Sequence, residues 1–421
     1  MGGIASSERC RVCVIGGGMV GSATAMHLAD AGVDVHVLSS GSSLPSSSDD
    51  MSRLIGPGDP AADASVAGFR ELERRSGESF WHDAGMLEVV PAHSRADEPA
   101  STRKLLKRAR QFLSFQEFFG RRGFTAHLTE NGRGWMDPRG FCRASRTVAE
   151  QGGARWHHDR AVHVDGEQGD FVVTTHGGTH LHAKAVVLAL GAFAPLSPGL
   201  VEACDATPLP TTMWGKTVYH ARISEASAKN LAPMPPLWVW PIEGVPEPTV
   251  SYEGAKAGSY FYIFPPVQYE DGHRYLKIGH SPHDPVISTL GGKGSGPEVA
   301  PTAEQVTTWF DGAAADASTP LGQEVVQLTA NSAEFFERVM GKTFAAEWEG
   351  GYATNCVTAK TTTGKRLLEQ IAPGLWHQTG CNGAGAAAAL AWGEETAQAV
   401  LHTIGEDYKQ TGWTAWRPGQ D

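Results

Sequence analysis

A glycine-rich motif close to the N-terminus constrains the fold of this chain more than any other feature. The apolar run Val12–Ile15 predicts a buried parallel strand. Residues 19–31 then have helical composition, and residues 33–38 predict a second strand. The turn between the first strand and the helix carries the spacing G-x-G-x-x-G, formed by Gly16, Gly18 and Gly21. A glycine fingerprint alone is a weak signal, but inside a strand–helix–strand unit it predicts a dinucleotide site.

Each glycine of this motif has its own physical task. Gly16 permits the tight turn, and Gly18 lets the backbone approach a pyrophosphate. Gly21 lets the helix pack closely on the strand. Met19 and Val20 open the helix, whose N-terminal amides and dipole favour an anion. We therefore expect all five residues to contact the cofactor.

The second strand ends differently from a typical nicotinamide site. An Asp or Glu there usually binds a ribose hydroxyl, whereas this chain has Ser39 and Ser40. A serine is also able to bind the ribose. The missing acidic residue therefore makes NAD a less favoured cofactor and keeps FAD as an alternative. A long polar loop follows, and a second buried strand at 185–190 ends in Gly191 far downstream. This order predicts a flavoprotein with a discontinuous nucleotide domain.

Composition sets wider limits. A chain of 421 residues predicts about two domains. Its net charge of −11 argues against nonspecific nucleic-acid binding, and we identified no apolar run that could span a bilayer. The absence of a secretion signal and the six scattered cysteines favour a reducing, cytoplasmic location. Cys10 and Cys13 form a C-x-x-C pair, but Cys13 falls in the predicted strand, so we expect core packing.

Several further motifs occur in a fixed order along the chain. They are "SRLIG" (52–56), "HDAGMLEVVP" (82–91), "MDPRGF" (136–141), "VVLALGAF" (186–193), "YLKIGH" (275–280), "NCVTAKT" (355–361) and "GCNGAG" (380–385). Together with the glycine fingerprint they resemble the sarcosine oxidase branch of the D-amino acid oxidase superfamily, whose members use FAD to oxidise C–N bonds of amines. The resemblance covers most of the chain.

The resemblance implies roles for particular residues. Cys356 matches the position where this branch attaches FAD covalently through a thioether, although a buried free cysteine is usually only a packing residue. Lys277 matches the lysine that activates oxygen above the flavin, against the alternative of a strand lysine facing solvent. Arg53 matches an arginine close to the flavin, and its alternative is a surface arginine. We also name His280 as a candidate catalytic group.

The same resemblance extends the set of expected cofactor contacts. Beyond the glycine turn and the two serines of the second strand, it adds Ser52, Arg53, Val162, Gly191, Cys356, Gly383 and Gly385. The expected partners are a small amine substrate and molecular oxygen, with no nucleic acid and no membrane, in a monomer or homodimer. We predict no metal site, because the clustered His176, His180 and His182 are expected to be exposed imidazoles in a hairpin turn, and we expect the same of His157 and His158.

The chain departs from the family at the substrate site. Amino-acid oxidases of this branch clamp the substrate carboxylate with an arginine and a lysine, as charge-assisted binding requires. The matching positions here are Gly56 and Ala387. We therefore predict a substrate with no carboxylate at that place, or a bulkier one that fills the vacated volume. The alternative is that Lys360, Arg366 or His280 replaces the lost cations.

The expected fold is α/β, with a Rossmann-like FAD-binding domain and a second domain built on an antiparallel sheet. We assign residues 1–85, 136–205 and 346–421 to the FAD domain, and residues 86–135 and 206–345 to the substrate domain. The leading function is an FAD-dependent amine oxidase that releases H2O2. The alternatives are a dehydrogenase of the same fold that oxidises an amine or a 2-hydroxy acid with another acceptor, and a catalytically idle binding module.

Overall fold

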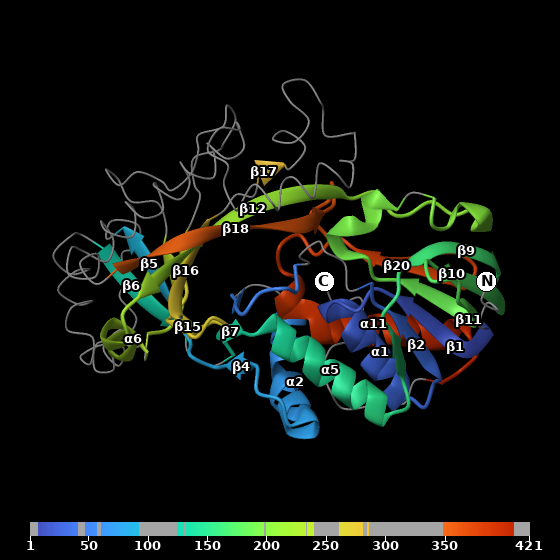
Figure 1. Cartoon of the computed structure of the whole chain (residues 1–421), viewed down its shortest axis with the longest axis horizontal. Helices are drawn as coiled ribbons and strands as arrows, with labels where there is room; N and C mark the ends of the chain where they lie inside the picture. The colour runs from blue at the N-terminus through green and yellow to red at the C-terminus, as the bar shows by residue number, and fades with distance from the viewer. Residues whose placement is uncertain are drawn as a thin grey trace, which may run out of the picture.

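Two large sheets organise the chain, with most of the helices gathered beside one of them (Figure 1). The computed structural model describes residues 7–40, 47–56, 60–91, 124–129, 132–197, 199–232, 234–239, 261–280, 284–285 and 348–407. In these ranges, no helix is both long and apolar enough to cross a membrane. Residues 101–123, a stretch rich in lysine and arginine, lie outside them.

The first sheet has eight strands and a parallel centre. Its main path runs in the order β19-β20-β11-β1-β2-β8, and β10 and β9 extend it from β11 as an antiparallel hairpin. The strands are β1 (Ser7–Ile15), β2 (Val35–Leu38), β8 (Arg155–His157), β9 (Ala161–Glu167), β10 (Asp170–Thr175), β11 (His180–Leu188), β19 (Leu367–Ala372) and β20 (Leu375–Thr379).

Four helices lie beside the first sheet and share its main core. They are α1 (Met19–Asp30), α2 (Pro60–Ser76), α5 (Pro138–Gln151) and α11 (Gly385–Thr403). Alternate side chains of β1 point to opposite sides, so Val12 and Val14 join this core while Cys13 and Ile15 join a second cluster with β9 and β10. The predicted core role of Cys13 is confirmed, because it is fully buried. Short helices η2 (Gly191–Leu196) and η3 (Glu202–Cys204) follow β11.

The predicted strand–helix–strand unit is present, and the geometry of its glycines explains it. Gly16 has φ of +117°, and a β-carbon there would lie 2.3 Å from the carbonyl oxygen of Ala189. A β-carbon at Gly21 would lie 1.9 Å from the carbonyl oxygen of Gly16. Both positions therefore exclude any side chain, as the close packing of helix on strand requires.

The second sheet has nine strands and is antiparallel except where β13 pairs with β5. Its path is β17-β12-β16-β14-β13-β5-β6, with β15 on β16 and β18 on β12. The strands are β5 (Met86–Pro91), β6 (Phe124–Thr129), β12 (Thr212–Ile223), β13 (Leu237–Val239), β14 (Phe261–Ile263), β15 (Val267–Gln268), β16 (Arg274–His280), β17 (Asp284–Pro285) and β18 (Trp348–Lys360). The helix α6 (Glu225–Leu231) follows β12.

The two long strands β12 and β18 run side by side across the molecule (Figure 1). A third, small sheet is formed by β3 (Arg53–Ile55), β7 (Gly134–Met136) and β4 (Trp81–His82). The α/β class with an antiparallel second sheet is thus confirmed. The domain boundaries remain a proposal, and β18 pairs within the second sheet although residues from 346 onward were assigned to the FAD domain.

Candidate active site

A buried cluster of charges joins the second sheet to the segment that precedes β3. Lys277 lies in β16, an inner strand between β12 and β14, and is only 2% exposed. Its ammonium group donates to the carboxylate of Asp50 at 2.5 Å and to the carbonyl oxygen of Ser52 at 2.8 Å. The strand alternation of the sequence left the direction of Lys277 open, and the structure turns it inward.

Arg53 contacts the same carboxylate from the start of β3. Its guanidinium donates to Asp50 and, at 2.6 Å, to the carbonyl oxygen of Ser47. The hydroxyl of Tyr269 lies 3.2 Å from the other carboxylate oxygen of Asp50. Burial raises the pKa of Asp50, but the positive charges of Lys277 and Arg53 outweigh it and hold that pKa well below its usual value. Asp50 is therefore ionised.

Two cations and one carboxylate leave this cluster with a net positive charge of one. His220 does not add to it. His220 lies opposite Lys277 in the β12–β16 ladder and stacks on Tyr352 with ring centroids 4.6 Å apart. Burial lowers the pKa of His220 to about 3, so the imidazole is neutral. Among the described residues, neither of its ring nitrogens has a hydrogen-bond partner.

The N-terminus of α1 fits a phosphate. Gly18 provides no side-chain cap, and the first turn contains no acidic residue that would repel an anion. The amide of Met19 points outward and donates to the hydroxyl of Ser48 at 3.2 Å, which shows that an acceptor is accommodated there. A β-carbon at Gly18 would lie 3.3 Å from the same hydroxyl, so a side chain would fill the space in front of the helix. The residues present therefore suit the pyrophosphate of FAD.

Ser39, expected to bind the ribose, follows β2 beside this turn. Its amide donates to the carbonyl oxygen of His157 at 3.0 Å, which fixes its backbone. Its side chain is partly exposed and that of Ser40 is exposed. A β-carbon at Gly17 would lie 2.8 Å from the hydroxyl oxygen of Ser39, so the serine lies directly against the glycine turn.

The positions of the missing carboxylate clamp are closed. At Gly56, a β-carbon would lie 3.0 Å from Cζ3 of Trp238, so the indole occupies the space into which a longer side chain would extend. Ala387 is 6% exposed and packs in the core of the first sheet. A cation at either position would have to displace packed neighbours. The local packing therefore leaves no room for a cationic side chain at Gly56 or Ala387.

The other predicted site residues are spread over several elements. Gly191 begins η2 with φ of +58°, and Gly383 has φ of +92° in the turn before α11, which Gly385 opens. Val162 lies near the start of β9 and is 41% exposed. Cys356 lies in β18 opposite Lys216, and His280 ends β16 opposite Phe261. The side chains of Cys356 and His280 lie outside the described part of the structure.

The sequence gives little sign of Asp50, which belongs to the charge cluster, or of the neutral His220 beside it. Asp50 is separated from Lys277 by 227 positions, and its only local signal is an acid three residues before Arg53 at the end of a serine-rich loop. His220 has no sequence signal, because only the pairing of β12 with β16 brings it beside Lys277.

The glycine turn, the parallel sheet and the second antiparallel sheet define a two-sheet dinucleotide-binding oxidoreductase. The chain belongs to the FAD dependent oxidoreductase family (DAO), whose sequence profile matches residues 11–399. A search of curated proteins found no match.

Solved structures with the same fold cover nearly the whole chain. NikD, an unusual amino acid oxidase of nikkomycin biosynthesis, is 16% identical with a TM-score of 0.63, covering 97% of this chain and 99% of NikD. L-Proline dehydrogenase from P. horikoshii is 18% identical with a TM-score of 0.61, covering 97% and 96%. Fructosyl amine:oxygen oxidoreductase from Aspergillus fumigatus is 20% identical with a TM-score of 0.58, covering 97% and 89%. At these identities the likeness establishes the fold.

Proposed function

We propose that this protein is an FAD-dependent amine oxidase. When bound, FAD would accept a hydride from the carbon next to the amine nitrogen, giving an imine that water hydrolyses, and would pass both electrons to oxygen as H2O2. The buried cluster of Lys277, Arg53 and Asp50 is the observation that carries this proposal, because its net charge is positive. A fixed positive charge in a dry site stabilises negative charge that develops during electron transfer to oxygen.

One set of residues would bind the cofactor, and another set supplies the positive charge. The amides at the start of α1 would hold the pyrophosphate, and Ser39 would bind the ribose. Lys277 is held in one position by Asp50 and the carbonyl oxygen of Ser52, so its charge needs no rearrangement during the reaction. His220 is neutral and adds no further charge. A substrate that binds as the neutral amine requires no general base.

The packing around Gly56 and Ala387 supports a substrate without a carboxylate at that place. A carboxylate bound there would meet an indole and a buried alanine in place of two cations. Leaving such a charge unpaired costs about 2–5 kcal/mol. Trp238 offers instead a flat apolar surface, which suits a larger or aromatic substrate group. We therefore include in the proposal a bulky amine that lacks the α-carboxylate.

Substrate profiling tests this function. Amines without a carboxylate should be turned over with one H2O2 formed for each O2 consumed, whereas sarcosine and pipecolate should be poor substrates. From the unpaired-charge cost, we expect their kcat/KM to be at least about 30-fold lower. The measurement is oxygen uptake together with peroxide release for each amine.

Each alternative has its own outcome in that assay. Turnover of sarcosine or pipecolate equal to the best amine would contradict the no-carboxylate proposal. Substrate oxidation that proceeds only with an artificial electron acceptor would identify a dehydrogenase. Purified protein without yellow colour that cannot be loaded with FAD would favour a binding module.

Covalent attachment of FAD through Cys356 is a separate part of the proposal. Acid precipitation of the native protein should leave the yellow colour in the pellet, and Cys356→Ser should release it into the supernatant. Cys381→Ser is the matched control, because Cys381 also lies close to β18, with its sulfur 3.7 Å from the carbonyl oxygen of Ala359. If Cys381→Ser releases the yellow colour and Cys356→Ser retains it in the pellet, FAD is attached to Cys381 and this part of the proposal is wrong.

A further inference from the structure

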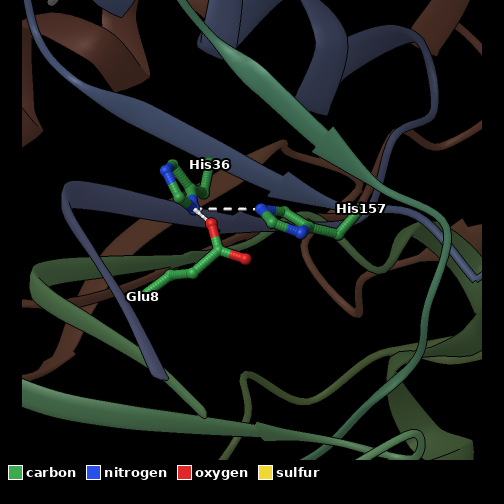
Figure 2. Close-up of side chains that lie close together, drawn as sticks. All are labelled: Glu8, His36 and His157. Atoms are coloured by element: carbon green, nitrogen blue, oxygen red, sulfur yellow. Dashed lines mark hydrogen bonds and ion pairs between the residues drawn. The ribbon is translucent and has the colours of Figure 1, made fainter. Parts of the chain in front are cut away.

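We propose that Glu8, His36 and His157 form a binding site for a divalent transition-metal ion such as zinc. The three residues lie in β1, β2 and β8, which are adjacent strands of the first sheet. Figure 2 shows the two imidazoles directed at one another and the carboxylate of Glu8 beside them. The site shares no residue with the charge cluster around Lys277.

The distances are close to those of a metal site. Nδ1 of His36 lies 2.9 Å from Nε2 of His157 and 3.9 Å from Oε2 of Glu8. All three ligand atoms lie within 4.8 Å of one another. A tetrahedral zinc ion with ligands at about 2.0–2.1 Å separates its ligand atoms by about 3.3 Å. Small side-chain rotations would therefore bring all three atoms to one ion, and water would complete the coordination.

The surroundings of His36 favour the ligand role. His36 is fully buried, and its other nitrogen, Nε2, lies 3.9 Å from Oδ1 of Asp34. Metal-binding histidines usually donate the N–H of the second nitrogen to a carboxylate, and Asp34 lies on that side of the ring, beyond hydrogen-bond distance. Nε2 has no hydrogen-bond partner among the described residues, which leaves it free to turn to Asp34.

The third ligand, Glu8, is available and reachable. Its side chain is 37% exposed, so an ion can approach from solvent. Arg155 is its competing partner, but the closest approach of the two is 3.7 Å, too long for a hydrogen bond. Arg155 lies closer to Asp34, at 3.3 Å. Arg155 therefore restrains the carboxylate of Glu8 through an ion-pair contact at 3.7 Å and not through a hydrogen bond.

A metal ion at this site would stabilise the edge of the first sheet that is expected to bind the nucleotide. The carbonyl oxygen of His157 accepts the hydrogen bond from the amide of Ser39. Tying β1, β2 and β8 together would therefore also fix the strand end that carries the expected ribose contact. We assign the ion a structural role, because the site does not include the charge cluster that supports the proposed oxidation.

Zinc binding by the flavin-loaded full-length protein tests the proposal. After treatment with a chelator and dialysis, Zn2+ is titrated in competition with a chromophoric chelator. One Zn2+ per chain should bind, His157→Gln and Glu8→Gln should abolish this site, and Asp34→Asn should weaken it by about 10–100-fold. His163→Gln is the matched control, because His163 is an exposed histidine of β9 in the same sheet. The control should bind zinc like the native protein.

Two further measurements keep the test decisive. Co2+ in place of zinc should give absorption bands of a nitrogen and oxygen ligand set, and bands of a thiolate ligand would overturn the assignment by pointing to cysteine. Zinc should also raise the Tm of the native protein and of His163→Gln but not that of Glu8→Gln. Equal zinc binding by all variants would show that zinc binds at another place and would overturn the assignment. No binding by the native protein would show that the two imidazoles merely hydrogen-bond to each other.

Discussion

Replacing Lys277 by methionine should slow reoxidation of the reduced enzyme by oxygen by about 100- to 1,000-fold. Methionine keeps much of the side-chain volume of lysine but carries no charge. Of the two cations of the cluster, Asp50 then retains only Arg53, and the net charge of the cluster falls from plus one to zero. Electron transfer to oxygen loses its electrostatic support, while oxidation of the amine, which does not use that charge, should change far less. Stopped-flow absorbance of the two half-reactions measures both rates.

Two comparison variants make the result specific. Lys184→Met removes an exposed lysine of β11 in the first sheet and should leave both rates unchanged. Asp50→Asn leaves Lys277 and Arg53 without their shared carboxylate, and breaking such a buried pair should destabilise the protein by about 3–5 kcal/mol. If Lys277→Met reacts with oxygen as fast as the native enzyme, Lys277 does not activate oxygen and the proposed role of the cluster is wrong.

Local backbone geometry made the nucleotide-binding unit predictable. Gly16 and Gly21 are required because a β-carbon at either would collide with a backbone carbonyl oxygen. Such a constraint is visible in the sequence, because only glycine satisfies it. The same is true of α5, where Asp137 caps the helix and Pro138 starts it, within the motif "MDPRGF". Periodicity and turn chemistry act over a few residues, so the sequence displays them.

The functional contacts depend instead on tertiary pairing. Lys277 meets Asp50 only because β16 lies inside the second sheet and the segment before β3 folds against it. Trp238 covers Gly56 across a similar gap in the chain, so sequence comparison could register the missing arginine but not the indole that occupies its space. Glu8 and His157 likewise become neighbours only through the strand order β1-β2-β8. No local pattern encodes these contacts.

A pair of glycine substitutions should separate folding from cofactor binding. Gly21→Ala places a β-carbon 1.9 Å from the backbone oxygen of Gly16, which cannot move without opening the β1–α1 turn. We expect a loss of stability of about 3 kcal/mol or more, the upper end for overpacking, together with loss of FAD. Denaturant unfolding and the flavin-to-protein absorbance ratio measure the two effects.

Gly18→Ala is the matched variant for the same turn. Gly18 has φ of −71° and ψ of −175°, which alanine adopts without strain, and its β-carbon would meet only the hydroxyl of Ser48 at 3.3 Å. The protein should therefore fold with nearly native stability but bind FAD weakly, because the new methyl group fills the space in front of the α1 amides. A Gly18→Ala protein that retains full flavin content would mean that the pyrophosphate lies elsewhere. Equal destabilisation by both variants would mean that the turn is needed for folding alone.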